Sequence, residues 1–264
     1  MQYTLGFIGC GNMGGALVNA AAKALGGEKI AVCDYCVEKA KAFEPLGVSV
    51  LSANELATSC KFVVLGVKPQ NMQETLDGIS AELKTNQGVV MITMAAGIST
   101  AAIRAFVGAE LPVIRIMPNT PALLGEGMIL YDTLGVAEAD EKAFLTCFAQ
   151  AGVLDKLPEA KIDAASALSG CGPAFVYAFA EALADGAVEC GVPREKANTY
   201  AAQTLLGAAK MLKEFGHPAD LKDAVCSPGG TTIAGIHALE KAGFRSAAMD
   251  AVFAAYQRTL ELKK

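Results

Sequence analysis

Short apolar runs alternate with amphipathic stretches over the first part of the chain. The runs predict strands at Tyr3–Ile8, Lys29–Asp34, Phe62–Val67, Gly88–Met94, Pro112–Met117, Met128–Tyr131 and Val153–Leu157. The stretches between them predict helices at Met13–Leu25, Cys36–Leu46, Asn71–Leu83, Ser99–Val107 and Glu138–Ala151. Almost continuously apolar strands that alternate with helices are typical of an α/β fold with a doubly wound parallel sheet, covered on both faces.

The pattern changes after Pro158, where the strand signals stop. Helices are predicted at Lys161–Leu168, Ala174–Cys190, Arg194–Phe215, Pro218–Cys226, Thr231–Lys241 and Phe244–Leu262. We therefore expect two domains, 1–160 and 161–264. The stretch Ala174–Val188 is apolar around most of a helical circumference, which indicates burial on every side. Since few helices are available to cover it, a subunit interface is expected in this half.

Composition and charge exclude several classes of protein. Of the 264 residues, 53% are hydrophobic and 19% charged, which excludes a disordered chain. The net charge of −5 comes without a basic cluster, so nucleic acid is not an expected partner. The longest apolar stretches, such as 164–180, contain Ser, Gly and Pro, and we expect no membrane partner. Met1–Ile8 leads directly into a strand, without the pattern of a secretory signal.

The eight cysteines are irregularly spaced in a chain that is large enough to fold without disulfides. They are interpreted as reduced thiols of a cytoplasmic protein. Cys33 and Cys36 form a single C-x-x-C pair, and the only histidines are His217 and His237. A zinc ribbon needs a second pair of ligands, so no metal is expected.

Gly9-Cys10-Gly11-Asn12-Met13-Gly14 is a G-x-G-x-x-G motif between the first predicted strand and helix. The first glycine permits a tight turn, the second lets the backbone approach a pyrophosphate, and the third lets helix and strand pack closely. The start of the helix supplies oriented N–H groups for the anion. In this position the motif predicts a dinucleotide site.

Asp34 ends the second predicted strand, where an acidic side chain can accept a hydrogen bond from the adenosine ribose 2′-hydroxyl and repel a 2′-phosphate. That interpretation favours NADH. An aspartate that only caps the next helix explains the residue equally well. Lys39 and Lys41 follow on that helix.

Two further turns follow strands that are expected to end at the same edge of the sheet. They are Val67-Lys68-Pro69-Gln70 and Thr93-Met94-Ala95-Ala96-Gly97-Ile98. Because ligands of doubly wound sheets lie outside the carboxyl ends of the strands, both turns should border the cofactor. The small residues of the second turn allow close approach of a flat ring. For Lys68, a solvated surface charge is an equally good explanation.

In the helical half, Ser227-Pro228-Gly229-Gly230-Thr231-Thr232 precedes or opens a predicted helix. Its small residues expose amide groups at a helix start, flanked by three hydroxyls, which suits a carboxylate ligand. Neither histidine lies in a catalytic pattern, and no nucleophile or metalloprotease motif is present. These features favour a reaction without a strong protein acid or base, such as hydride transfer to a protonated imine.

Taken together, the motifs resemble the pyrroline-5-carboxylate reductase family over essentially the whole chain. The resemblance lies in Asn12-Met13-Gly14, Val67-Lys68-Pro69-Gln70, Met94-Ala95-Ala96-Gly97, Met117-Pro118-Asn119-Thr120-Pro121, Ala167–Ala174, Glu181–Asp185, Gln203-Thr204 with Gly207–Leu212 and, most specifically, Ser227–Gly235. It implies a Rossmann-type sheet followed by an all-helical dimerisation domain. The implied reaction is reduction of 1-pyrroline-5-carboxylate to L-proline by NADPH or NADH.

The resemblance also implies roles for residues. It assigns the substrate carboxylate to Ser227, Gly230 and Thr231, and places Thr232, the candidate catalytic residue, near the ring nitrogen. Cofactor residues map onto Gly9, Gly11, Asn12, Met13, Asn54, Lys68, Ala95 and Ala96, to which the spacing argument adds Asp34. Family members assemble as homodimers or as decamers of dimers. The sequence Cys33-Asp34-Tyr35-Cys36 departs from the Asn-Arg or Ser-rich turn of many bacterial members, which leaves the choice between NADPH and NADH open.

Two alternatives share the predicted layout. β-Hydroxyacid dehydrogenases carry a catalytic Lys and an Asn at the start of their helical domain, where this chain has Val176 and Ala180. A non-catalytic sensor of NAD(P)H would have no use for the substrate-type turn at 227–232.

Overall fold

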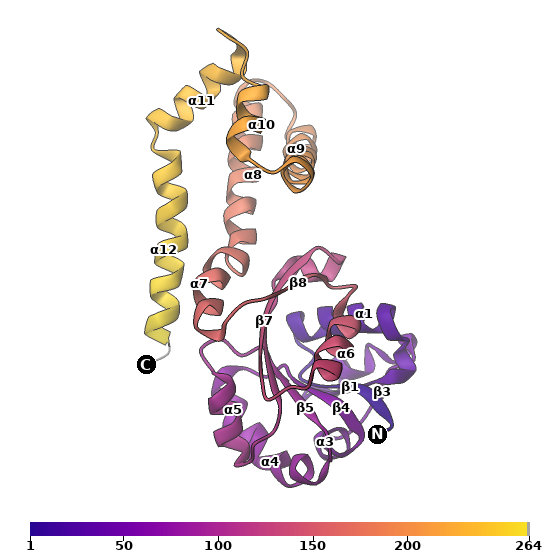
Figure 1. Cartoon of the computed structure of the whole chain (residues 1–264). Helices are drawn as coiled ribbons and strands as arrows, with labels where there is room; N and C mark the ends of the chain where they lie inside the picture. Colours follow the sequence, from indigo (N-terminus) through magenta and orange to yellow (C-terminus); the bar gives the residue numbers. More distant parts are fainter. Residues whose placement is uncertain (263–264) are drawn as a thin grey trace. The chain divides into compact units, whose positions relative to one another are not determined.

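The computed structural model describes residues 1–262 and divides by its contacts into two units (Figure 1). The first unit comprises Met1–Cys171 and residues 255–262, and the second comprises Gly172–Ala254. Each unit is described separately below.

One sheet of eight strands organises the first unit, in the order β3-β2-β1-β4-β5-β6-β7-β8. The strands are β1 (Tyr3–Ile8), β2 (Ile30–Cys33), β3 (Ser49–Val50), β4 (Cys60–Leu65), β5 (Val90–Thr93), β6 (Val113–Met117), β7 (Gly127–Leu134) and β8 (Gly152–Lys156). The order from β3 to β6 is that of a Rossmann fold, which confirms the predicted fold class.

One strand pair corrects the expectation of an entirely parallel sheet. β6 and β7 pair antiparallel, with Arg115 opposite Asp132. A parallel connection needs a crossover of a dozen or more residues, usually a helix. Only residues 118–126 join these strands, and a short 3-10 helix at Thr120–Leu124 occupies most of them. The chain therefore turns back directly.

Helices cover both faces of the sheet (Figure 1). They are α1 (Asn12–Leu25), α2 (Val37–Lys41), α3 (Ala53–Ser59), α4 (Met72–Thr85), α5 (Thr100–Val107), α6 (Glu138–Phe148) and α7 (Glu159–Ser169). On one face Phe7 of β1 packs with Leu17 of α1 and Phe148 of α6. On the other, Leu65 of β4 packs with Leu76 of α4 and Ile103 of α5. Side chains of successive strand residues thus enter two hydrophobic cores on opposite faces of the sheet, which explains why the strands are apolar throughout.

The segment between β2 and β4 differs from the predicted elements. The expected helix Cys36–Leu46 divides into α2 and a 3-10 helix at Glu44–Leu46, because Pro45 cannot continue an α-helix. β3 and α3 were not predicted. α3 nevertheless has a sequence signal, since Ser52 and Glu55 form a capping box at its start.

Helix α7 belongs by its contacts to the first unit, where it packs on β6 and β7. The contacts divide the chain after Cys171, whereas the change in sequence pattern lies near residue 160. The domain boundary at 160 stays a prediction.

The second unit is helical, with α8 (Gly172–Glu189), α9 (Arg194–Phe215), α10 (Pro218–Ala224), α11 (Thr231–Lys241) and the first part of α12 (Phe244–Leu262). α8 and α9 pack through the buried residues Ala184, Ala197 and Ala201. Many large apolar side chains are exposed, among them Val176, Tyr177, Leu183, Leu206, Met249 and Phe253. This chain by itself does not cover the apolar surface of its helices.

The segment Glu159–Glu189 is also the one helical stretch among the described residues that is long and apolar enough to cross a membrane. Only 11% of its apolar window is buried within the chain. Length and composition alone do not separate a membrane span from a helix that lies in a subunit interface, so the expectation of no membrane partner stays a prediction.

Candidate functional site

The glycine turn after β1 has the conformation that a dinucleotide needs. Gly9 has a φ of +101°, and a Cβ there would lie 2.7 Å from the backbone of Gly66. A Cβ on Gly14 would collide with the carbonyl oxygen of Gly9, so this glycine allows α1 to approach β1. A Cβ on Gly11 would meet nothing within 4 Å. The middle glycine therefore faces open space, where backbone can approach a ligand.

The start of α1 offers unsatisfied donors beside that space. Gly11 is the N-cap residue, no side chain caps the helix, and its first turn holds no acidic residue. The first hydrogen bond of the helix runs from the Gly15 N–H to the Gly11 carbonyl. The N–H groups of residues 12–14 have no helical partner and lie at the positive end of the helix dipole. This arrangement suits a phosphate.

Asp34 connects the end of β2 to the glycine turn. Its Oδ2 accepts the Cys10 N–H at 2.6 Å, and its Oδ1 accepts the Cys36 N–H at 2.9 Å. Cys36 is the N-cap residue of α2, so Asp34 does not cap that helix. Since a carboxylate has about four acceptor positions, both contacts leave room for a ribose hydroxyl.

A cleft of about 720 Å³ lies along the ends of β1, β2 and β4. It is lined by five of the predicted cofactor residues, Gly9, Gly11, Asp34, Asn54 and Lys68. The cleft continues the glycine turn on the side of β2, where a dinucleotide places its adenosine.

Four predicted cofactor residues lie outside this cleft. Asn12 is exposed and lines a neighbouring hollow of about 320 Å³, and Met13 is half-buried. Ala95 is 3% exposed and Ala96 is exposed, in the turn that follows β5. This turn lies on the β4–β5 side of the glycine turn, the side on which a Rossmann fold places the second nucleotide.

The cleft also contains residues that sequence reasoning did not assign. Lys39 of α2 lines it together with Lys68, and neither lysine forms an ion pair or hydrogen bond among residues 1–262. Tyr35 is fully exposed at the same place. Two cations without partners favour a phosphorylated ligand. The signal for Lys39 was its position in the helix that follows Asp34.

Asn54 has its amide nitrogen occupied within the fold. This nitrogen donates to the Gly78 carbonyl at 3.1 Å and to Glu82 Oε1 at 2.7 Å, which ties α3 to α4. The bond from Asn54 lowers the pKa of the Glu82 carboxyl. Only the amide oxygen of Asn54 remains for a ligand.

The thiols around Asp34 are protonated at neutral pH. Burial, together with the nearby Asp34 carboxylate, raises the pKa of Cys10 to about 12. Burial also raises the pKa of Cys33. All eight cysteines are unpaired. Within residues 1–262, no group of three or more His, Cys, Asp or Glu side chains is arranged to hold a metal ion.

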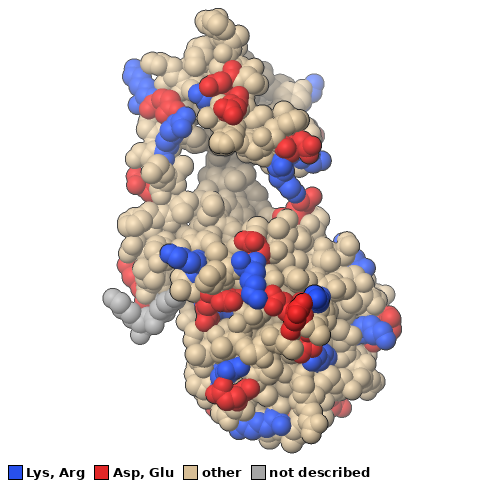
Figure 2. Space-filling model, viewed as in Figure 1, with Lys and Arg blue, Asp and Glu red and all other residues tan. Residues whose placement is uncertain are grey.

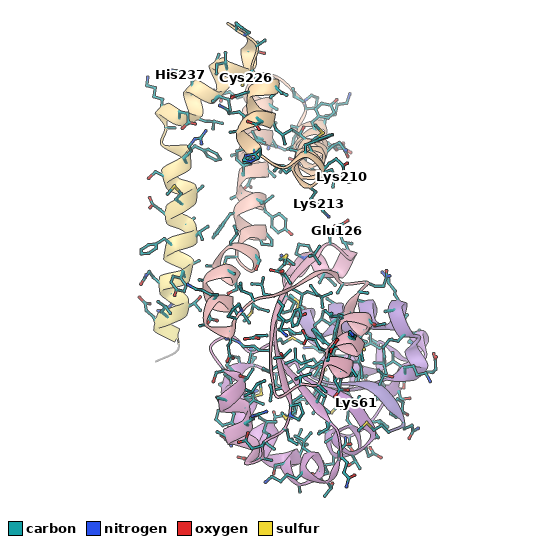
Figure 3. The ribbon with its side chains drawn as sticks, in the orientation of Figure 1. Lys61, Glu126, Lys210, Lys213, Cys226 and His237 are labelled. Atoms are coloured by element: carbon teal, nitrogen blue, oxygen red, sulfur yellow. The ribbon has the colours of Figure 1, made fainter. Side chains whose placement is uncertain are left out.

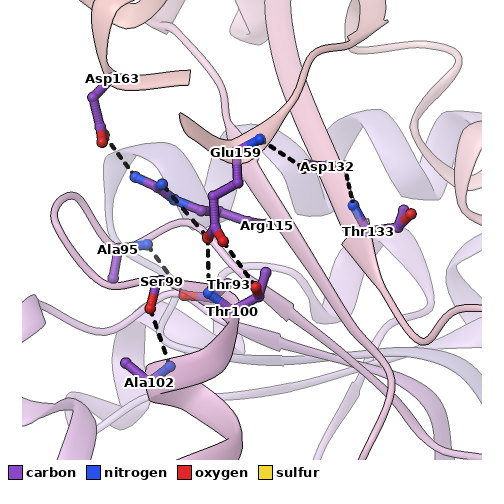
Figure 4. Close-up of polar contacts among 10 residues, drawn as sticks. All are labelled: Thr93, Ala95, Ser99, Thr100, Ala102, Arg115, Asp132, Thr133, Glu159 and Asp163. Atoms are coloured by element: carbon purple, nitrogen blue, oxygen red, sulfur yellow. Dashed lines mark hydrogen bonds and ion pairs between the residues drawn. The ribbon is translucent and has the colours of Figure 1, made fainter. Parts of the chain in front are cut away.

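Buried polar contacts support the carboxyl end of β6. Arg115 lies between Asp163 and Glu159 of α7, in the group of residues that Figure 4 shows. Asn119 donates to the Ser169 carbonyl at 2.8 Å and accepts the Met128 N–H at 2.9 Å. The amide of Asn119 therefore shapes the turn and is not free for a ligand.

The four predicted substrate residues come together at the start of α11 in the second unit. Gly230 is the N-cap residue and donates its N–H to the Ser227 carbonyl at 3.0 Å. No side chain caps the helix, and Ser227, Thr231 and Thr232 are exposed. The turn thus presents free N–H groups and hydroxyls, which suits a small anion.

Two further polar residues lie on either side of this turn in the sequence. Figure 3 labels Cys226, which precedes the turn, and His237, which lies further along α11. His237 is exposed. On the face shown in Figure 2, acidic and basic side chains are interspersed over both units without a large patch of one sign.

Family models match both parts of the chain. Residues 159–262 match the model described as pyrroline-5-carboxylate reductase dimerisation. Residues 4–97 match the model described as NADP oxidoreductase coenzyme F420-dependent.

Relatives match over the full length. The chain is 43% identical over 266 residues to pyrroline-5-carboxylate reductase 3 of Danio rerio, covering 99% of this chain and 92% of that protein. It is 37% identical over 273 residues to pyrroline-5-carboxylate reductase of Escherichia coli, covering 100% of both. The crystal structure of the Plasmodium falciparum pyrroline carboxylate reductase with NADP bound is 33% identical, with a TM-score of 0.88 over 100% of both chains. The pyrroline-5-carboxylate reductase structure from Coxiella burnetii is 29% identical, with a TM-score of 0.91 over 100% of both.

Proposed function

The chain belongs to the pyrroline-5-carboxylate reductase family, and from this we infer that it reduces 1-pyrroline-5-carboxylate to L-proline with NADPH or NADH. The observation that carries the inference is the similarity of the whole chain to these reductases, sheet and helical part together. The bound cofactor supplies the hydride that reduces the imine carbon.

The residues at the end of β1 fit such a cofactor. Gly11 leaves space that a larger side chain would fill, and the start of α1 presents free amides to the pyrophosphate. We assign Gly9, Gly11, Asn12 and Met13 to this contact. Asp34, Asn54 and Lys68 line the adjoining cleft and would hold the adenosine part of the cofactor. Ala95 and Ala96 leave room for the nicotinamide ring.

The start of α11 is assigned to the substrate. Ser227, Gly230 and Thr231 present a hydroxyl and N–H groups to the substrate carboxylate, without a basic side chain. Thr232 is adjacent and its hydroxyl can accept a hydrogen bond from the iminium nitrogen. The hydroxyl orients the imine, which arrives already protonated, so the residues of this turn need no proton donor.

Both alternative functions are disfavoured by the full-length match. Val176 and Ala180 stand where a β-hydroxyacid dehydrogenase carries its Lys and Asn. A non-catalytic sensor of NAD(P)H does not need a substrate-binding turn, and this chain has all the residues of that turn at the start of α11.

The helical part dimerises. Residues 159–262 match the dimerisation model, and the exposed apolar side chains of α8 and α12 supply the surface for a partner. A decamer built from such dimers is the larger assembly that we propose. The unpaired state of all eight cysteines supports a location in the cytoplasm.

The reaction is tested by following cofactor absorbance. We expect oxidation of NADPH or NADH with 1-pyrroline-5-carboxylate and none with panels of keto acids, and no reduction of NADP⁺ or NAD⁺ with hydroxy acids. Turnover of a hydroxy acid at a rate equal to that of the imine would overturn the proposal. The assay is run with each cofactor in turn.

A further inference from the structure

A buried ion cluster lies beside the end of β5, where Arg115 pairs with Thr93 in the sheet. Arg115 of β6 is 2% exposed, and its Nη2 lies 2.7 Å from Asp163 Oδ1 of α7. Its Nη1 lies 3.6 Å from Oε1 of Glu159, the first residue of α7. Figure 4 shows both carboxylates directed at the same guanidinium.

Glu159 also holds the start of α5. Its Oε1 accepts the Thr100 N–H at 2.8 Å, and its Oε2 accepts the Thr100 hydroxyl at 2.9 Å. Both carboxylate oxygens are therefore directed at one residue of the first turn of α5. Ser99, the N-cap residue of α5, accepts the Ala102 N–H at 3.1 Å.

The turn at Ala95–Gly97 is fixed from its other side by β5. The Thr93 hydroxyl accepts the Ala95 N–H at 3.3 Å, and Thr93 pairs with Arg115 in the sheet register. The turn thus lies between a contact to the buried Thr93 and the start of α5, which Glu159 holds. Only Ile98 and Ser99 separate the turn from Thr100.

Stability alone is a poor explanation for this cluster. Buried ion pairs often contribute little net stability, because the desolvation of the charges offsets their attraction. Here the Nε of Arg115 is buried and has no hydrogen-bond partner. The cluster does provide a fixed geometry, because the planar guanidinium group of Arg115 orients both acidic side chains.

We propose that Glu159, oriented by Arg115, is a positioning residue for the nicotinamide half of the cofactor. It holds Thr100 and, through it, the Ala95–Gly97 turn, without touching the reacting atoms. The adenosine half binds at the ends of β1 and β2 and does not depend on this contact. This inference rests on the proposed function, because that function assigns the turn to the nicotinamide ring.

The test compares the whole cofactor with a fragment that lacks nicotinamide. For Glu159→Ala, the Kd of NADPH is expected to rise about tenfold, as for the loss of a hydrogen bond to a charged group. The Kd of 2′-phospho-ADP-ribose should change by less than about twofold. A fall in kcat should accompany the loss, since a displaced ring presents its hydride poorly.

Two milder variants keep the test independent of folding. Glu159→Gln keeps an acceptor for the Thr100 N–H and is expected to bind NADPH within about twofold of wild type. Thr100→Val removes one hydrogen bond to Glu159 and should weaken NADPH binding about threefold, again without effect on the fragment.

Asp140→Ala is the matched control. The Asp140 side chain is 24% exposed, close to the 27% of Glu159, and it lies in the first turn of a helix, 2.7 Å from Lys61, which Figure 3 labels. The Asp140→Ala variant should lower thermal stability. It should not change the Kd of NADPH relative to the Kd of 2′-phospho-ADP-ribose.

The proposal is overturned if Glu159→Ala weakens NADPH and the fragment equally or leaves both unchanged. It is also overturned if Glu159→Gln binds NADPH as weakly as Glu159→Ala. Nucleotide binding is measured without substrate, so these outcomes are separate from failure of the wild type to reduce 1-pyrroline-5-carboxylate.

Discussion

Asp34 illustrates how one side chain can hold the fold and a ligand together. Its two oxygens accept the N–H groups of Cys10 and Cys36, and the same carboxylate lines the cleft together with Lys39. A 2′-phosphate in this cleft would be repelled by the Asp34 carboxylate and attracted by the Lys39 ammonium group. The choice of cofactor therefore depends on the balance between these two residues.

Asp34→Ser is expected to raise the ratio of kcat/KM with NADPH to kcat/KM with NADH by about tenfold, because the negative charge beside the 2′-phosphate is removed. Lys39→Met should change the ratio in the opposite direction. Steady-state kinetics with both cofactors measure both effects. An unchanged ratio in Asp34→Ser would mean that the carboxylate serves only the glycine turn.

Thr232 is exposed in the first turn of α11 and is the one side chain assigned to the iminium nitrogen. Thr232→Ala is expected to lower kcat/KM between about tenfold and a hundredfold, as for loss of a hydrogen bond to a charged group. His217→Ala and His237→Ala should leave kcat nearly unchanged. A loss of more than about a thousandfold in either histidine variant, with the fold intact, would reveal a general acid.

At the scale of elements, α11 combines an open N-terminus with a crowded turn before it. A Cβ on Gly230 would collide with the Ser227 hydroxyl, whereas a Cβ on Gly235, in the same helix, would meet nothing within 4 Å. The two glycines thus differ in the space around them.

Gly230→Val is expected to raise KM for the substrate at least tenfold and to leave the Kd of NADPH unchanged, since the side chain displaces Ser227 from the carboxylate site. Gly235→Ala is the control in the same helix and should keep wild-type kinetics. A Gly230→Val enzyme with wild-type kcat and KM would remove α11 from the substrate site.

At the scale of the whole molecule, the first unit carries buried thiols whose ionisation opposes folding. Burial raises the pKa of Cys60 from 9.0 to about 12 and that of Cys147 to about 11. A pKa raised in the folded state contributes stability that is complete below pH 9 and is lost between pH 9 and the folded-state pKa.

We expect the free energy of unfolding to fall steeply above pH 9. Each such thiol makes the downward slope steeper by about 1.4 kcal/mol per pH unit. Cys60→Ala should make this slope shallower by about that amount, even if the variant is less stable at pH 7. Cys36→Ala, which removes an exposed thiol, is the control. Urea denaturation between pH 8 and 11 measures the slopes, and equal slopes for Cys60→Ala and wild type would contradict the explanation.

The second unit depends on a partner for its apolar surface. Phe253 of α12 is 62% exposed in the single chain. Phe253→Glu is expected to place a charge in the dimer interface and to shift the mass seen by light scattering towards the 27.2 kDa of one chain. Leu46→Glu alters a similarly apolar, exposed position of the first unit and should leave the assembly intact. An unchanged mass for Phe253→Glu would exclude this part of α12 from the interface.

Local patterns were sufficient for most of the elements. β1, α9, α11 and α12 occur at the residues that the pattern indicated, because apolar periodicity and Gly or Pro at the ends are properties of adjacent residues. The glycine turn was also predictable, since each of its glycines meets a steric demand that the motif states by itself.

The tertiary structure decided what depends on distant residues. The antiparallel pairing of β6 and β7 follows from a connection too short to cross over. The bond from the Cys10 N–H to Asp34 joins two segments that only the sheet brings together, whereas the bond from the Cys36 N–H is local. The sequence pattern placed Arg115 only within a predicted strand, Pro112–Met117. Its role became visible only where α7 places Glu159 and Asp163 beside it, because the burial of a charge is a property of the packed fold.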